Sequence, residues 1–167
     1  MTISVEPATR DEATLLGNLL ELYLHDMSEV FPVELGPDGR YGYENLSRYW
    51  QEPDRFPFLI RSGREVLGFA LVTRGSPATD DRDDLDVAEF FVLRRFRRSG
   101  VGRRAAFALW DRLAGRWVVR AAERNHGARR FWRAIIQDYT RGRFEERTMP
   151  GSPNAWSVFT FASPGGE

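Results

Sequence analysis

Glycine and arginine occur together where a predicted buried strand gives way to a predicted helix. The sequence there is Val-Leu-Arg-Arg-Phe-Arg-Arg-Ser-Gly-Val-Gly-Arg, residues 92–103. The first N–H groups of a helix have no acceptor within the helix, and together with the helix dipole they attract an anion. Gly100 and Gly102 place no Cβ between this backbone and a ligand. The pattern therefore predicts a phosphate-binding turn.

Three arginines in the same segment strengthen this prediction, because a guanidinium donates charge-assisted hydrogen bonds to phosphate. They are Arg97, Arg98 and Arg103. The segment is not a Walker loop, which ends in Gly-Lys-Ser/Thr, and it is not a dinucleotide fingerprint, which needs three glycines at a fixed spacing. An ordinary strand-to-helix turn on an arginine-rich surface remains the alternative interpretation.

Apolar periodicity predicts the elements that would position this turn. Their order is β-α-α-β-β-β-α-β-α-β-β, which indicates one α/β domain with a mixed sheet and helices on both faces. Thr9 and Glu12 predict a capping box at the start of the first helix. The predicted elements are residues 3–5, 10–29, 42–51, 56–60, 65–73, 85–93, 102–113, 117–121, a helix that starts at 125 or 127, 144–149 and 156–162.

Composition fits a single domain, residues 1–167, with a core of about residues 3–162. Hydrophobic residues make up 42% and aromatic residues 13%, which is enough for a sizeable core. There is no Cys, so disulfides and thiolate chemistry are excluded, and with only 2 His we expect no metal site. Neither a signal pattern nor an apolar run of about 18 residues occurs, so we expect a cytoplasmic protein.

Charge is distributed unevenly, although the formal net charge is zero. Residues 1–93 hold 8 Arg and 18 acidic residues, whereas residues 94–147 hold 16 Arg and 5 acidic residues. The basic part predicts contact with a polyanion, and the acidic part predicts contact with a cation. All 24 cationic residues are Arg, a bias that also fits the codon usage of a G+C-rich bacterial genome.

The glycine-arginine segment resembles a known signature. Arg97-x-x-Gly100-x-Gly102 is similar to the Arg/Gln-x-x-Gly-x-Gly/Ala motif of the GNAT (GCN5-related) N-acetyltransferase superfamily. The longer family pattern, Val-x-Pro-x-x-Arg-Gly-x-Gly-Ile-Gly, aligns with the segment without a gap. Arg94 replaces the usual Pro and Arg98 replaces the usual Gly, whereas both phosphate-facing glycines are present.

A second segment, Asn125-x-x-Ala128-x-x-Phe131-Trp132, resembles the family's Asn-x-x-Ala-x-x-Leu/Phe-Tyr motif. It lies on the helix after the fifth predicted strand, and the order of elements agrees with the family along nearly the whole chain. The resemblance therefore implies a single-domain GNAT-like α/β fold. Its sheet is mixed and mostly antiparallel, helices cover both faces, and the fourth and fifth strands splay apart.

The resemblance also implies acetyl-CoA, or another acyl-CoA, as co-substrate. Backbone amides of the glycine loop would hold its pyrophosphate, the end of the fourth strand would pair with the pantetheine arm like an added strand, and Asn125 would hydrogen-bond the cofactor or the adjacent strand. The residues assigned in this way are Phe91, Val92, Leu93, Arg97, Arg98, Ser99, Gly100, Val101, Gly102, Arg103, Asn125 and Phe131.

GNAT enzymes transfer the acyl group directly to an amine, whose ammonium form has a pKa of about 10 and must first lose a proton. Glu89, the sole carboxylate of the apolar run 87–93, is the predicted general base; pairing with an Arg or facing solvent is the alternative. Trp132 stands where the family often has a tyrosine acid, and indole supplies no proton. Tyr139 is the predicted substitute, with core packing as the alternative. A thiol with a pKa of about 8.5 also leaves without an acid.

The predicted acceptor is a primary amine of a small molecule or peptide, and the acidic excess favours a cationic one. Candidates for its pocket are His25, Asp26, Glu29, Tyr41, Tyr43, Glu44 and Trp50. We expect a monomer or homodimer without nucleic-acid or membrane partners. Two other interpretations remain: a nucleic-acid-binding module that uses the Arg-rich part, and a degenerate GNAT domain that binds acyl-CoA as a sensor or scaffold without transfer.

Overall fold

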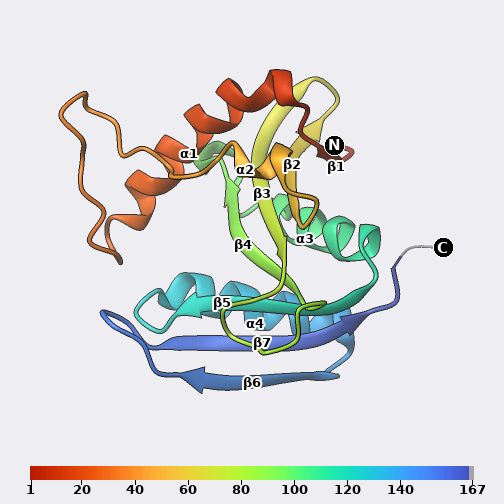
Figure 1. The fold of residues 1–167 in the computed structure, drawn as a ribbon. Helices are drawn as coiled ribbons and strands as arrows, with labels where there is room; N and C mark the ends of the chain where they lie inside the picture. The colour runs from red at the N-terminus through yellow and green to blue at the C-terminus, as the bar shows by residue number, and fades with distance from the viewer. Residues whose placement is uncertain (166–167) are drawn as a thin grey trace.

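A computed structural model describes residues 1–165 as one open sheet of seven strands with helices packed against it (Figure 1). The strand order is β1-β2-β3-β4-β5-β7-β6, and every neighbouring pair is antiparallel except β4 and β5, which run parallel. The predicted mixed, mostly antiparallel sheet is therefore confirmed. The strands are β1 (Ser4–Pro7), β2 (Arg55–Ser62), β3 (Glu65–Arg74), β4 (Leu85–Val92), β5 (Gly115–Ala122), β6 (Phe144–Met149) and β7 (Trp156–Ser163).

Helices cover both faces of the sheet, as predicted. The first two lie on one face and the last two on the other (Figure 1). They are α1 (Ala13–Met27), α2 (Arg48–Gln51), α3 (Val101–Arg112) and α4 (His126–Thr140), with short 3-10 turns η1 (Arg10–Glu12) and η2 (Arg94–Phe96). Within residues 1–165, no helix is both long enough and apolar enough to cross a membrane.

Each face of the sheet has its own hydrophobic core, because the helix period and the strand period each direct one apolar side inward. On the α1 side, Leu16 and Leu20 are fully buried against Phe69 of β3. On the α3 and α4 side, Trp110 and Trp117 are fully buried. The aromatic residues that the composition assigned to a core therefore fill two layers.

The predicted helix at 42–51 is much shorter in the structure, where only Arg48–Gln51 is helical. Gly42 and Asn45 adopt left-handed backbone conformations, with φ of 71° and 61°, which an α-helix does not admit. The predicted helix at 10–29 begins as η1, and the Thr9 amide donates to the Glu12 carboxylate at 3.0 Å, which is one half of the predicted capping box.

The sheet divides into two arms, which we define as β1–β4 and β5–β7–β6. Pairing between β4 and β5 extends over three positions only, from Leu85 opposite Trp117 to Val87 opposite Val119. Beyond Val87 the strands diverge, and Figure 1 shows β4 turning away from β5. The predicted splay of the fourth and fifth strands is therefore confirmed, and it leaves residues 88–92 of β4 without a partner on that side.

A β-bulge at Ala88 determines which side chains of β4 face each core. Leu71 of β3 pairs with Glu89 and Val72 pairs with Val87, so Ala88 is the extra residue. Before the bulge, Val87 faces the α3 and α4 core; after it, Phe91 faces the α1 core. The extra residue shifts the two-residue alternation by one, and Glu89 therefore faces the α1 side.

Gly68 allows β3 to approach β4 closely. A Cβ at this position would lie 2.0 Å from the carbonyl oxygen of Phe91. We predict that Gly68→Ala lowers the free energy of unfolding by about 2 kcal/mol or more, because backbone has to move to relieve the overlap. Chemical denaturation measures this change. Gly127→Ala is the control, because a Cβ there meets nothing within 4 Å. An equal loss of stability in both variants would contradict the prediction.

Candidate functional site

Glu89 lies at the bulge of β4, and two tyrosines bind its carboxylate. The Tyr23 hydroxyl of α1 donates a hydrogen bond to Oε2, and the Tyr43 hydroxyl donates to Oε1 at 3.3 Å. We call these three residues the Glu89 cluster. Its members come from three separate parts of the chain, and α1 and the segment before α2 bring the hydroxyls to the strand. Glu89 therefore neither pairs with an arginine nor faces solvent.

Burial raises the pKa of Glu89 above the ordinary value, against the effect of the two hydroxyls, which favour the charged form. Burial and the charge of Glu89 also raise the pKa of Tyr23 and of Tyr43. Both tyrosines therefore stay protonated and donate to Glu89 at neutral pH. A carboxylate with a raised pKa binds a proton more tightly than a surface carboxylate, which suits a general base.

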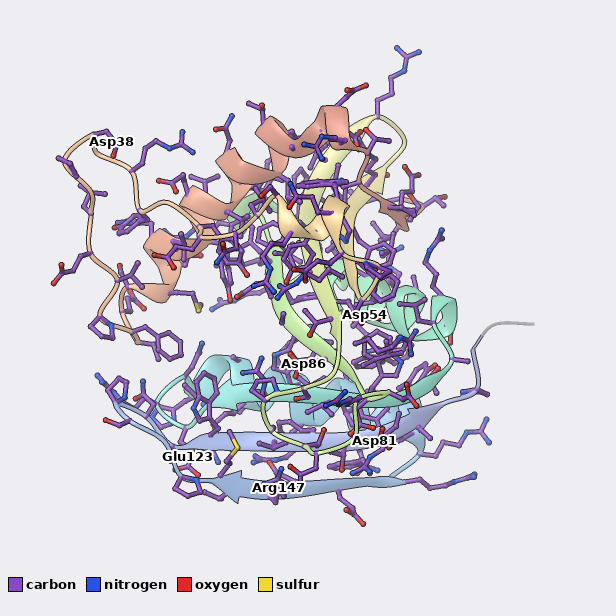
Figure 2. All side chains as sticks on the ribbon, viewed as in Figure 1. Asp38, Asp54, Asp81, Asp86, Glu123 and Arg147 are labelled. Carbon is purple, nitrogen blue, oxygen red and sulfur yellow. The ribbon has the colours of Figure 1, made fainter. Side chains whose placement is uncertain are left out.

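An ion pair closes the junction where the two arms separate. Arg120 of β5 donates to both oxygens of Asp86 of β4, at 2.9 and 2.8 Å. Ser76 donates to the same carboxylate at 2.7 Å, and Asp86 is buried at the junction (Figure 2). Sequence reasoning did not single out Asp86 or Arg120. The available signal was an acidic residue near the start of β4 and an arginine within the apolar part of β5, two strands that are otherwise mostly apolar.

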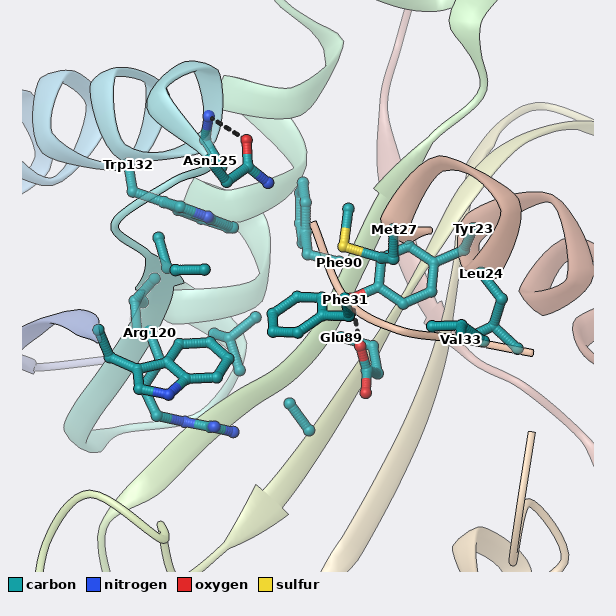
Figure 3. A pocket seen from close by; sticks show the side chains of 17 residues that line it. Tyr23, Leu24, Met27, Phe31, Val33, Glu89, Phe90, Arg120, Asn125 and Trp132 are labelled. Carbon is teal, nitrogen blue, oxygen red and sulfur yellow. Dashed lines mark hydrogen bonds between the residues drawn. The ribbon is translucent and has the colours of Figure 1, made fainter. Parts of the chain in front are cut away.

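Glu89 borders a cavity of about 350 Å³ between the arms (Figure 3). Side chains from α1 and the following segment lie on one side of it, and side chains from β5 and α4 lie on the other. Residues that line the cavity include Tyr23, Leu24, Met27, Phe31, Val33, Glu89, Phe90, Arg120, Asn125, Trp132 and Trp156. The cavity therefore joins the splayed edge of β4 to the Glu89 cluster.

The start of α3 has the free amides that the sequence predicts. The first helical hydrogen bond runs from the Arg104 amide to the Gly100 carbonyl at 3.1 Å, so the amides of Val101, Gly102 and Arg103 have no acceptor within the helix. Gly100 has a φ of 82°, and a Cβ there would meet nothing within 4 Å. The backbone at Gly100 is therefore open to a ligand.

Gly102 also serves the packing of α3 against α4. A Cβ at Gly102 would lie 3.0 Å from Cζ of Phe131, so the missing side chain makes room for this ring of α4. The second motif also serves the local fold, because the side-chain Oδ1 of Asn125 caps α4 by accepting from the Ala128 amide at 3.2 Å. Asn125 still lines the cavity (Figure 3).

Arg97 is bound to groups of the protein and is not directed at the α3 N-terminus. Its guanidinium donates to the Val92 carbonyl at 2.7 Å and to the Asp26 carboxylate at 2.7 Å. Arg94 donates to the other oxygen of Asp26 at 2.5 Å. Burial raises the pKa of Asp26, but the two arginines outweigh it and hold that pKa below its ordinary value. We call Asp26, Arg94 and Arg97 the Asp26 clamp; it ties α1 to the loop.

The other predicted loop residues are near the α3 N-terminus. Arg98 has a φ of 59°, so it keeps the left-handed conformation of the glycine that the family pattern has there. Ser99 donates its hydroxyl to the Phe96 carbonyl at 2.7 Å. Arg103 lies over the Phe107 ring at 4.4 Å, and its Nε is 3.6 Å from Asp138. Of the three predicted phosphate-binding arginines, Arg98 is the one whose guanidinium makes no hydrogen bond, ion pair or ring contact within residues 1–165.

Tyr139 is not brought together with Glu89. Its hydroxyl donates to Asp111 at 2.8 Å and bonds the Ser163 hydroxyl at 2.8 Å, and burial raises its pKa to about 12. It shares a helix face with Trp132, but seven residues correspond to about 10 Å along the axis. Trp132 lines the cavity and Tyr139 packs in the α3 and α4 core, so we do not propose Tyr139 as the acid.

Of the residues suggested for the acceptor pocket, only Tyr43 binds Glu89. Asp26 belongs to the clamp. His25 pairs with the Tyr41 hydroxyl at 3.0 Å, and Trp50 donates to the Ala8 carbonyl at 2.9 Å. Glu29 and Glu44 are exposed. Sequence reasoning missed Tyr23, because its place on the apolar stripe of α1 made it look like an ordinary core residue.

The fold combines an open helix N-terminus at α3 with an unpaired edge of β4. The model of the acetyltransferase (GNAT) family matches residues 18–135, and the chain belongs to this family. The prediction of an N-acetyltransferase is thus confirmed at the level of the family. No curated protein matches the chain.

Solved structures of acetyltransferases share the fold. An acetyltransferase from Thermus thermophilus has a TM-score of 0.68 at 19% identity, with 97% of each chain covered. An aminoglycoside acetyltransferase, AAC(6')-Ib, in complex with coenzyme A has a TM-score of 0.69 at 12% identity, with 96% of this chain and 95% of that chain covered. Spermidine N-acetyltransferase from Vibrio cholerae, in complex with CoA and spermine, has a TM-score of 0.64 at 11% identity, with the same coverage.

Burial raises the pKa of Glu89, so the ionised form of this residue lowers the stability of the folded protein. The folded state binds this proton more tightly than the unfolded state, so stability is highest below the unfolded-state pKa and falls as pH rises through the raised folded-state pKa. Glu89→Gln removes the charge and keeps an acceptor for Tyr23. We predict a higher melting temperature than wild type at about pH 7, with a difference that shrinks towards about pH 4. Glu44→Gln, at an exposed position, is the control. A destabilised Glu89→Gln variant at neutral pH would refute the expected cost.

Proposed function

We propose that this protein transfers an acetyl group from acetyl-CoA to a primary amine, with Glu89 as general base. One observation carries the proposal: the carboxylate of Glu89 borders a cavity at the point where β4 leaves β5. Family membership supports the reaction class, and the two CoA-bound structural relatives support the co-substrate.

The residues present fit acetyl-CoA. The amides of Val101, Gly102 and Arg103 would hold the pyrophosphate, with Arg98 as a further donor. The unpaired edge of β4, residues 88–92, would pair with the pantetheine arm. Acetyl-CoA supplies the acyl group as a thioester, whose C–S bond breaks as the new bond to the amine nitrogen forms.

The Glu89 cluster prepares the amine. An amine attacks only as the free base, so the ammonium proton passes to the Glu89 carboxylate, directly or through one water. Tyr23 and Tyr43 hold the carboxylate in place through their hydrogen bonds and act as positioning residues. Apolar side chains line the cavity beside Glu89, and the raised pKa of Glu89 strengthens the base.

A second candidate function is a domain that binds acyl-CoA without transfer, as a sensor or scaffold. Trp132 favours it, because this side chain lines the cavity and brings no acidic proton. A thiol-release assay with acetyl-CoA and a panel of amines separates the two functions. Thiol release that depends on the amine supports the enzyme, and CoA binding without release supports the sensor.

Glu89→Gln tests the base. We predict that kcat falls by about 10²- to 10⁴-fold and that the acidic limb of the pH profile, which follows the raised pKa of Glu89, disappears. CoA affinity, measured by isothermal titration, stays at the wild-type value. Glu44→Gln keeps full activity. Wild-type turnover by Glu89→Gln at neutral pH would remove Glu89 from this role.

Gly100→Glu tests the phosphate site. The added carboxylate places bulk and negative charge in front of the α3 amides, so we predict that CoA binding is lost in isothermal titration. Gly39→Glu is a matched control, because Gly39 has a φ of 81° and equally open surroundings on a remote loop. It carries the same strain and the same charge, and we expect unchanged affinity. Equal affinities in both variants would place the pyrophosphate elsewhere.

A further inference from the structure

The cavity beside Glu89 carries little charge. Glu89 is the one carboxylate and Arg120 the one cation that line it within residues 1–165, and both oxygens of Asp86 already neutralise Arg120. If Glu89 acts as the base, it takes up the proton of the reacting amine. A second ammonium group in this cavity would then have no counter-charge, and a buried charge without a partner is costly.

An adjoining hollow of about 450 Å³ does not supply that counter-charge. It shares Ala88 and Arg120 with the cavity. Its three carboxylates are matched by three arginines, and these residues are Glu52, Asp54, Asp86, Arg55, Arg74 and Arg120. The hollow therefore offers a polycation no net attraction.

Two stacked aromatic rings form one wall of the cavity. Phe31, in the segment after α1, stacks on Trp156, the first residue of β7, with ring centroids 5.5 Å apart and an interplanar angle of 24°. Arg120 lies over the Trp156 ring at 5.7 Å, and Asn154 donates to the Val30 carbonyl at 3.1 Å. These contacts connect the segment after α1 with the start of β7 beside the cavity.

The rest of the cavity lining next to α1, where the acceptor amine would bind, is apolar. Leu24 and Met27 of α1 and Val33 of the following segment lie beside Phe31 and Glu89 (Figure 3). Flat aromatic surfaces and apolar side chains bind flat apolar groups well, because the ligand buries area and its ring packs against theirs.

We propose that the acceptor is a monoamine carried on a flat apolar body, such as an arylalkylamine, with its nitrogen at Glu89 and its ring against Phe31. This inference rests on the proposed function and specifies its substrate class. It separates this chain from the two structural relatives named for aminoglycoside and spermidine, which are polycationic acceptors.

Initial rates of thiol release test the substrate class. With acetyl-CoA held constant, 2-phenylethylamine, propylamine, spermidine and kanamycin are compared at neutral pH. We expect kcat/KM for 2-phenylethylamine to exceed that for spermidine and for kanamycin by about tenfold or more. A higher value for spermidine or kanamycin overturns the inference and leaves the acetyltransferase proposal intact.

Phe31→Ala tests the wall. We expect KM for 2-phenylethylamine to rise about tenfold, with KM for acetyl-CoA and kcat/KM for propylamine unchanged. Leu35→Ala is the matched control, because Leu35 lies on the same segment and is 59% exposed. Phe31→Trp, which keeps a flat ring, restores a low KM. Equal behaviour of Phe31→Ala and Leu35→Ala overturns the inference.

Equilibrium binding separates this inference from the proposed function. Isothermal titration of 2-phenylethylamine into the CoA-bound wild-type protein reports on the cavity without turnover. Binding that Phe31→Ala weakens about tenfold supports the inference, even if no amine releases thiol and the transferase proposal fails. Absence of binding to the wild-type protein overturns the inference directly.

Discussion

Pairing between β4 and β5 ends at Val87, and the extra residue Ala88 follows immediately. These two features together create the site. The end of pairing opens an edge of the sheet, and the bulge turns Glu89 out of the α3 and α4 core towards the tyrosines of the other face. A regular strand would have directed Glu89 into the layer that contains Trp110 and Trp117. A carboxylate there would have had no hydroxyl partners.

Much of the fold and part of the site follow from local sequence patterns. Glycines at positions 100 and 102, after an apolar strand and before an amphipathic helix, predict an open helix N-terminus without reference to the rest of the chain. Glu89, the sole carboxylate of the apolar run 87–93, stands out for a similar reason, because such a charge needs a specific partner or a function. The arrangement of the strands in the sheet and the splay between the fourth and fifth strands were predicted from the resemblance to the GNAT family.

The partners of these residues depend on tertiary contacts that no local pattern encodes. Tyr23 lies 66 residues from Glu89 along the chain, and Arg97 lies 71 residues from Asp26. A one-residue bulge reverses the side that a strand residue faces, and periodicity does not reveal it. Tyr139 shows the limit of helical-face reasoning, because residues on one face of a helix can lie more than a turn apart along its axis.

The Asp26 clamp has a mechanical consequence for the site. Asp26 lies three residues after Tyr23 on α1, so the helical turn that is anchored to Arg94 and Arg97 also carries the hydroxyl that orients Glu89. Arg94 and Arg97 are exposed, so dissolved salt screens their ion pairs with Asp26. A higher ionic strength therefore loosens the contact between α1 and the loop, and through the same turn of α1 it also loosens the position of Tyr23 at the Glu89 carboxylate.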